Sequence, residues 1–114
     1  MEKKKYRIIL KSSEDNYNFC VIGNNDNNII TYNEKLNIVT NVIFDINNLI
    51  LKRENKDLFM NYNFKSKKGN IYIKELNKEL NIDIEIIKIE KSNNKIQIEY
   101  KIDNDKFIYS IMEV

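Results

Sequence analysis

The feature that most constrains this chain is an alternation of apolar and polar residues with a period of two. It is clearest in the closing stretch KIQIEYKIDNDKFIYSIMEV, residues 95–114, where the alternation runs, turns at DND and runs again. A period of two places successive side chains on opposite faces of a β-strand, so each such segment has one apolar and one polar face. The pattern recurs along the sequence and predicts an all-β protein.

Short polar segments separate the apolar runs and mark the turns. They are rich in Asn, Asp, Lys and Ser, and they are GNNDNN at 23–28, DINN at 45–48, KKGN at 67–70, SNNK at 92–95 and DNDK at 103–106. Asn and Asp tolerate positive φ and hydrogen-bond their own backbone, and links this short join antiparallel neighbours. We therefore expect one domain, residues 1–114, that forms a mostly antiparallel meandering barrel of about eight to ten strands, with a two-sheet sandwich as the alternative.

Two segments depart from the regular alternation. The phase slips between Ile86 and Ile87, which indicates a β-bulge or a strand that passes from one side of the core to another. The segment IKELNKELN, residues 73–81, spaces Leu76 and Leu80 four apart. That spacing favours a short helical turn near residues 74–80, or a wide turn, over a strand, which is the alternative for this segment.

Composition bounds the class of protein. The 114 residues are 42% hydrophobic and 32% charged with a net charge of +2, which is typical of a globular domain with its own core. The one cysteine, Cys20, excludes an internal disulfide, and its apolar neighbours Phe19 and Val21 favour a packed or semi-buried thiol over a reactive one. Because no segment approaches the roughly 20 apolar residues of a membrane span, we expect a cytoplasmic protein without membrane contact.

The residues that usually carry chemistry are scarce. Histidine, the commonest general base and metal ligand, is absent. The carboxylates of Asp83, Glu85 and Glu99 would form a cation or catalytic site if the strands brought them together, but an exterior paired with lysines is the simpler interpretation. The Asn- and Asp-rich turns lack the glycine and glutamate of a calcium loop. We interpret the protein as non-catalytic, without a metal or cofactor.

A loose set of residues spread over nearly the whole chain is similar to a known family. These residues are Tyr32 and Glu34 followed by a strand with Thr40, then ILKRENKDLFMNYNF at 50–64, Tyr72, and the strands KIQIEYKI and FIYSIMEV. Together they resemble the YwiB-like family of bacterial proteins, which has no established activity. The resemblance implies a calycin-like barrel similar to that of lipocalins. The chain departs from the family after Tyr72, where IKELNKELN replaces a Thr-Pro-x-Gly-like corner.

The barrel interior is the leading candidate for a functional site. A barrel of this size is either filled by side chains or just wide enough for one small ligand. Aromatic rings would pack an apolar ligand, and tyrosine hydroxyls or an arginine would hold its polar end. The candidate ligand-binding residues are Arg53, Met60, Tyr62, Phe64, Tyr72, Tyr100, Phe107 and Tyr109. We predict a module that binds a small, partly apolar ligand in or at the mouth of the barrel; the alternative is that these rings pack only against one another.

The lysine-rich segment FKSKKGNIYIK, residues 64–74, supports a different function. It interleaves lysines with Phe64 and Tyr72, as a small barrel that binds single-stranded nucleic acid would. The net charge of +2 is low for that role, so nucleic acid is the less favoured partner. The second hypothesis is therefore an interaction barrel that binds single-stranded nucleic acid or a protein through its lysines. We expect a monomer, or a homodimer if the last strands lie at an open sheet edge.

Overall fold

Eleven strands form one antiparallel sheet in the computed structural model, which describes residues 2–36 and 38–114. The strands are β1 (Glu2–Lys11), β2 (Asn16–Asp26), β3 (Ile29–Lys35), β4 (Val39–Asp45), β5 (Ile50–Glu54), β6 (Leu58–Asn63), β7 (Lys68–Ile73), β8 (Lys78–Asp83), β9 (Glu85–Lys91), β10 (Lys95–Ile102) and β11 (Asp105–Glu113). The described residues contain no helix, so none that could span a membrane. The all-β prediction is confirmed.

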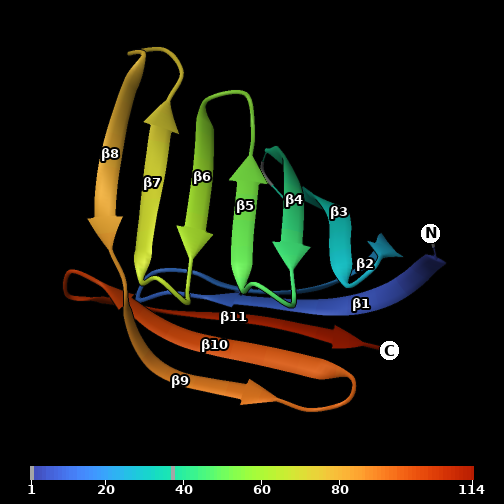
Figure 1. Cartoon of the computed structure of the whole chain (residues 1–114). Helices are drawn as coiled ribbons and strands as arrows, with labels where there is room; N and C mark the ends of the chain where they lie inside the picture. The colour runs from blue at the N-terminus through green and yellow to red at the C-terminus, as the bar shows by residue number, and fades with distance from the viewer. Residues whose placement is uncertain (1, 37) are drawn as a thin grey trace.

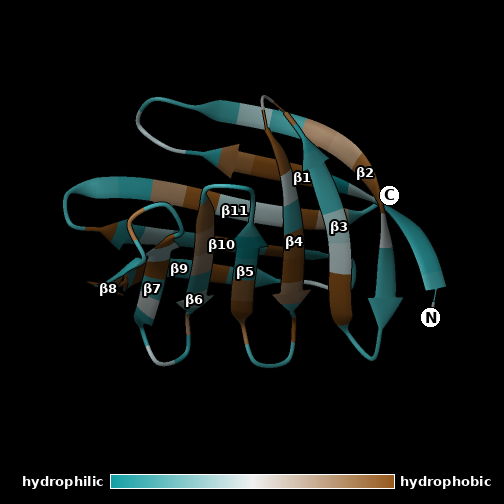
Figure 2. Ribbon diagram, turned by 90° about the horizontal axis from the view of Figure 1, so that it is seen from above, coloured by the Kyte–Doolittle hydropathy of each residue, from teal (hydrophilic) through white to brown (hydrophobic). Residues whose placement is uncertain are grey.

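The sheet is a meander that nearly closes into a barrel. Its strand order is β8-β7-β6-β5-β4-β3-β2-β1-β11-β10-β9, so every strand lies beside its sequence neighbour except at the corner between β8 and β9. In Figure 1, β3 to β8 stand side by side while β1, β9, β10 and β11 run across beneath them. Figure 2 shows the same crossing from above. The predicted barrel is confirmed, with β8 and β9 as its two unjoined edges and eleven strands where about eight to ten were expected.

The C-terminal hairpin forms as its alternation predicted. β10 and β11 pair with Ile98 opposite Tyr109 and Tyr100 opposite Phe107. β11 also pairs with β1, which joins the two ends of the chain. Since β10 also pairs with β9, neither of the last two strands lies at an edge of the sheet. A homodimer through these strands was expected only if they formed an open edge, so that expectation does not apply.

The core lies between the two crossing layers and is built largely of rings. The ring of Phe44 from β4 meets that of Tyr109 from β11 at a centroid distance of 5.2 Å, and Phe64 meets Tyr100 from β10 at 5.0 Å. The buried apolar residues are Tyr6, Ile8, Ile30, Tyr32, Val42, Phe44, Leu51, Tyr62, Phe64, Ile84, Ile96, Ile98, Tyr100, Tyr109 and Ile111. They lie on the inward face of their strands, because a period of two points every second side chain of a strand toward the core.

The turns use asparagine, and less expectedly leucine and lysine, in the left-handed conformation. Asn27 and Asn28 have φ angles of 52° and 65°, which suit a two-residue hairpin turn of type I′. The turn predicted at 23–28 is confined to these two residues, because β2 continues to Asp26. Leu49 and Lys67 also take positive φ, at 52° and 62°.

Gly69 lies inside β7 and is needed for a close approach and not for a turn. A Cβ atom at this position would lie 2.9 Å from Cδ1 of Tyr62 and 3.0 Å from the backbone oxygen of Asn61. Any larger residue would therefore push against a buried ring.

The two segments that depart from the regular alternation, at Ile86–Ile87 and at residues 73–81, fold differently. The phase slip is a β-bulge: Glu99 lies opposite Lys88 while Tyr100 lies opposite Ile86, so Ile87 is the extra residue. For residues 73–81 the helical alternative is wrong: residues 74–77 form a turn, and from Lys78 onward the less favoured strand alternative is correct. The N–H of Asn77 donates to the carbonyl of Lys74 at 3.2 Å, and the chain then enters β8, which completes a hairpin with β7.

Cys20 is exposed, so the prediction of a packed or semi-buried thiol is wrong. It lies opposite Arg7 in the β1–β2 ladder, on the outer face of the sheet. Phe19 and Val21, its neighbours in sequence, pack against the core. The strand alternation places the flanking apolar residues inward and therefore the cysteine outward.

Candidate functional site

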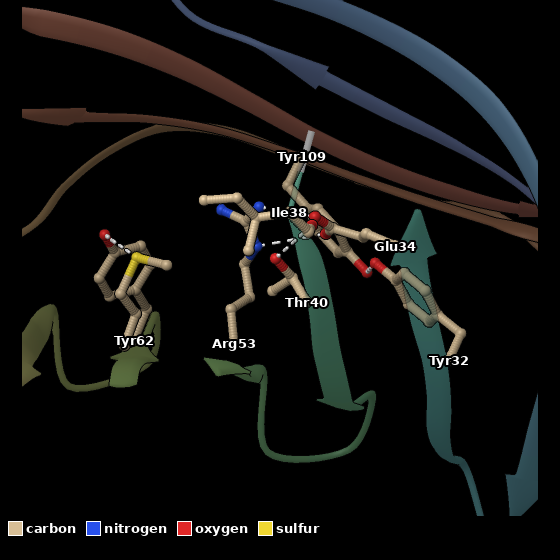
Figure 3. A network of polar contacts seen from close by, with 8 residues as sticks. Tyr32, Glu34, Ile38, Thr40, Arg53, Tyr62 and Tyr109 are labelled. Carbon is tan, nitrogen blue, oxygen red and sulfur yellow. Dashed lines mark hydrogen bonds and ion pairs between the residues drawn. The ribbon is translucent and has the colours of Figure 1, made fainter. Parts of the chain in front are cut away.

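A buried ion pair lies near one end of the barrel. Glu34 from β3 and Arg53 from β5 both point inward, toward each other across β4 (Figure 3). Nε of Arg53 donates to Oε1 of Glu34 at 3.2 Å, and Nη2 donates to Oε2 at 2.8 Å. The Glu34 side chain is 1% exposed and that of Arg53 24%. This two-point contact fixes the plane of the guanidinium as well as its position.

The charge of Arg53 is maintained by its partner. Burial alone lowers the pKa of Arg53, but the attraction and hydrogen bonds of the Glu34 carboxylate outweigh it and hold the pKa above its ordinary value. A charge this deep needs such a partner, since an unpaired one costs several kcal/mol of desolvation. The Glu34–Arg53 ion pair therefore has a fixed orientation, and its cationic end, the Arg53 guanidinium, is only partly covered by other side chains.

A pair of tyrosine hydroxyls lies beside the ion pair. The hydroxyls of Tyr32 and Tyr109 are 2.8 Å apart and buried (Figure 3). Burial, the neighbouring Tyr109 and the negative charge of Glu34 raise the pKa of Tyr32 well above its ordinary value. Burial likewise raises the pKa of Tyr109. Both hydroxyls therefore stay protonated at neutral pH and act as hydrogen-bonding groups of the core, not as proton carriers.

A pocket of about 170 Å³ opens beside Arg53 at the mouth of the barrel, where the ends of β1, β3, β5 and β10 meet. Tyr100 and Phe107 form its aromatic wall, with stacked rings whose centroids are 5.4 Å apart. The pocket is lined by Leu10, Lys11, Ser12, Asp15, Tyr17, Leu36, Arg53, Tyr100, Phe107 and Ile108. An apolar wall facing a few fixed polar groups is typical of small-molecule sites.

The charges around the pocket nearly cancel while hydrogen-bond donors remain. Arg53 is offset by Glu34, and the rim carries one residue of each charge, Lys11 and Asp15. A guanidinium has five N–H donors. Two of its nitrogens contact Glu34, and no other acceptor for Arg53 is found among the residues the structure describes. The pocket can thus donate a hydrogen bond to a ligand without requiring that the ligand be charged.

The structure brings together three of the predicted ligand-binding residues. Arg53, Tyr100 and Phe107 line the pocket. Tyr62, Phe64 and Tyr109 stand behind them as core residues, with the ring of Tyr62 at 6.2 Å from that of Tyr100. Met60 is half-buried in the same interior, where its Sδ accepts a hydrogen bond from the Tyr62 hydroxyl at 3.8 Å. The interior is therefore packed by side chains at these positions, and the accessible part of the predicted site is its mouth.

Tyr72 does not belong to the interior, so its placement there was wrong. It lies opposite Phe59 in the β6–β7 ladder, and its hydroxyl donates to the side-chain oxygen of Asn77. Ile71 takes the inward position next to it and packs against the core. Alternation alone would have excluded Tyr72, since Ile71 and Ile73 already mark the apolar face.

Sequence reasoning missed Glu34 and the rim of the pocket. Glu34 shares the face of Ile30 and Tyr32 along β3, and a carboxylate on an apolar face requires a cationic partner. The sequence therefore contained a signal that Glu34 is buried with a cationic partner. By contrast, no pattern connects Ser12 and Asp15, in the link between β1 and β2, with Arg53 on a strand about 40 residues further along.

A larger groove lies on the outside of the barrel, where β2 and β3 diverge. The two strands pair only through Asn24 to Asp26, and beyond them a hollow of about 720 Å³ separates the strands. Phe19, Ile22 and Ile43 are among its lining residues, and Lys35 is the one charged residue among those that line it. Its polar lining residues are Asn24, Thr31, Asn33 and Asn41, but it has no buried charged group comparable with Arg53, so it orients a ligand less strictly than the pocket at the mouth.

The three carboxylates proposed as a cation site are not gathered. Asp83 lies on β8 and pairs with Lys68, whereas Glu85 lies on β9 beyond the corner at Ile84 and opposite Lys101. Asp83 and Glu85 therefore lie on different strands, although only Ile84 separates them in the sequence. Within residues 2–36 and 38–114 no group of three His, Cys, Asp or Glu residues could hold a metal ion.

The lysine-rich surface is partly neutralised. Lys68 pairs with Asp83, and Nζ of Lys74 lies 2.8 Å from a carboxylate oxygen of Glu54. Phe64 is 1% exposed, so its ring is not accessible to a nucleic-acid base. Of the two rings in residues 64–74 only Tyr72 lies outside the interior, so the segment does not present the series of exposed rings on which single strands stack.

Comparison with known proteins gives no relative for this chain: no protein-family model, no curated protein and no solved structure matches it. The resemblance to the YwiB-like family therefore stays a prediction.

Proposed function

We propose that the protein is a non-catalytic binding module that takes one small, partly apolar ligand at the mouth of its barrel. The observation that carries the proposal is the pocket in which the fixed guanidinium of Arg53 faces the aromatic wall of Tyr100 and Phe107. A rigid donor opposite an apolar wall orients a ligand with one polar and one apolar end. The packing of the rings behind this wall favours the mouth over the interior.

The size and charge of the pocket define the class of ligand. A volume of about 170 Å³ corresponds to roughly six water molecules, and so to a ligand of roughly six to ten non-hydrogen atoms. Because Glu34 already balances Arg53, a carboxylate on the ligand would add an uncompensated negative charge next to a buried one. We therefore expect a neutral acceptor, such as an amide or ketone carbonyl, on a short apolar body.

Two matched probes test this proposal: hexanamide and hexanoate, which have the same size and differ in charge. Eight non-hydrogen atoms at about 0.5 kcal/mol each give about 4 kcal/mol, or a Kd of about 1 mM. Saturation-transfer NMR should show saturable binding of hexanamide and weaker binding of hexanoate. No saturable binding of either probe contradicts the proposal, and stronger binding of hexanoate overturns the neutral-ligand assignment.

Two variants locate the binding. Phe107→Ala removes one ring of the wall and should weaken hexanamide binding about fivefold, since a buried ring contributes of the order of 1 kcal/mol or more. Ile43→Ala changes the outer groove and should leave the affinity unchanged. Equal effects of the two variants would argue against the mouth as the site.

The proposal also includes a calycin-like barrel and a cytoplasmic location. The nearly closed antiparallel meander supports the former, and the composition supports the latter. The interaction barrel with a lysine-rich surface remains the second hypothesis, with less support from the pairing of Lys68 and Lys74. Its test is salt-sensitive binding of an oligothymidylate that is lost in Lys67→Glu.

A further inference from the structure

β9 is an open edge of the barrel. It pairs with β10 on one side, and in the described part of the chain no strand lies on its other side. Ile87 and Ile89 are 44% and 41% exposed along this edge. An edge with unpaired backbone groups and exposed apolar side chains is a template for another strand.

The hairpin fixes which backbone groups of β9 point outward. The N–H of Ser92 donates to the carbonyl of Lys95 at 2.8 Å, so these residues close the hairpin between β9 and β10. Hydrogen-bonded and non-hydrogen-bonded pairs alternate from that point along an antiparallel ladder. Glu90 and Lys88 therefore direct their backbone groups toward β10, whereas Lys91 and Ile89 direct theirs outward.

The bulge limits how much of the edge is regular. Ile87 is the extra residue in the ladder, and the alternation changes phase before it. Only residues 88–91, with Ile87 at their margin, present an uninterrupted edge. A second strand must therefore pair with this stretch.

We infer that two copies of the chain pair through β9 in an antiparallel two-fold dimer, with Ile89 opposite Ile89. This register exchanges outward backbone groups between the two Ile89 residues and places Lys88 opposite Glu90 twice. Lys88 and Glu90 are then non-hydrogen-bonded neighbours, whose side chains come closest across a ladder. Within one copy Nζ of Lys88 already lies 2.6 Å from Oε1 of Glu90, and the dimer gives each lysine a second carboxylate.

The neighbouring registers are excluded by like charges. A two-fold axis at Glu90 would set two glutamates opposite each other, and an axis at Lys88 would set two lysines opposite each other. Like charges directly opposite destabilise a strand pair. The charge pattern thus selects the register centred on Ile89.

The other edge, β8, does not have this self-complementarity. The N–H of Ile84 donates to the carbonyl of Lys67 at 3.0 Å, and the alternation from there points the backbone of Glu79, Asn81 and Asp83 outward. Centred pairing of two β8 strands on Asn81 would set Glu79 opposite Asp83 twice. No two-fold register of β8 sets Lys78 opposite Glu79 or Asp83, so β8 lacks the opposite-charge pairs of β9, and the partner of a second copy is β9.

Charge reversal and its rescue test the dimer. Sedimentation velocity from about 10 µM to about 1 mM should show a reversible dimer of the unaltered chain. Lys88→Glu turns two attractive cross-strand pairs into repulsive ones and should raise the dimer Kd about tenfold or more. The double variant Lys88→Glu with Glu90→Lys restores opposite charges and should return the Kd to within about threefold of the unaltered chain. Glu79→Lys on β8 is the matched control and should leave the Kd unchanged.

Amide exchange tests the register in the same samples. The amide of Ile89 should become protected as the concentration rises, while that of Glu90, already bonded to β10, should be protected throughout. A chain that stays monomeric up to about 1 mM overturns the inference. So does a double variant that fails to restore dimerisation although its circular dichroism is unchanged, or a dimer that responds to Glu79→Lys.

Discussion

Replacing Glu34 by glutamine tests whether the buried ion pair holds the mouth of the barrel together. Glutamine keeps the size of the side chain and removes its charge, which leaves Arg53 without a counter-ion. Breaking a buried pair on one side costs about 3–5 kcal/mol, because the remaining charge is uncompensated. The Arg53 side chain is 24% exposed, so water compensates part of this loss. We expect the free energy of unfolding to fall by about 2 kcal/mol.

Urea denaturation followed by far-ultraviolet circular dichroism measures this loss. A slope of about 1.3 kcal/mol per molar urea converts it into a midpoint lower by about 1.5 M, and thermal unfolding should shift by about 8 °C. Glu79→Gln is the matched control, since Glu79 is an exposed residue of β8, and it should change the free energy by less than about 0.5 kcal/mol.

The double variant Glu34→Leu with Arg53→Met separates charge from packing. Replacing both partners by apolar residues of similar volume removes the desolvation cost together with the attraction, so at least half of the lost stability should return. If Glu34→Gln is no more destabilising than Glu79→Gln, the pair does not hold Arg53, and the account of the site is refuted.

Three further perturbations follow from the same structure. Gly69→Ala should cost about 1–3 kcal/mol in urea denaturation, because the new Cβ would lie 2.9 Å from the buried ring of Tyr62; an unchanged midpoint would show that the strand can shift. Lys67→Gly should raise the free energy of unfolding by about 0.5 kcal/mol, since Lys67 has a φ of 62°, whereas a decrease would contradict the strain. Four tyrosines have pKa values raised by burial, so their contribution to stability is present below the unfolded pKa of about 10 and is lost as pH rises above it. The thermal midpoint should therefore fall above about pH 10, and the tyrosinate absorbance of the folded chain should stay below that of the denatured chain; equal absorbances would contradict burial of Tyr32, Tyr62, Tyr100 and Tyr109.

The elements predicted best are those in which one local rule decides the outcome. Alternation along residues 95–114 predicted the β10–β11 hairpin and its inward residues, including Tyr100 and Tyr109. The break in phase at Ile87 predicted the bulge. In the hairpin the apolar face faces the core, so the sequence period and the burial agree, whereas beyond the bulge Ile87 and Ile89 are exposed at the edge of the sheet.

The failures occur where long-range pairing decides. KELNID became β8 because the edge of β7 was available to pair with it, and this pairing outweighs the helical spacing of Leu76 and Leu80. Cys20 and Tyr72 are a different case. The alternation of their strands places both side chains on the outer face, although their apolar or aromatic character favours the interior. Of the site, Arg53 and its aromatic wall could be predicted, but the contact with Glu34 depends on two strands that only the folded sheet brings together.

The most direct test of the central claim is where a bound probe lies on the folded chain. Titration of the ¹⁵N-labelled protein with hexanamide should shift the amides of Leu10, Phe107 and Ile108 together with the Nε–H signal of Arg53, all with one saturation curve. This result is expected if the ligand lies between the guanidinium and the aromatic wall. Shifts confined to Thr31, Asn33 and Ile43 in the outer groove, or no saturable shifts, would contradict the account.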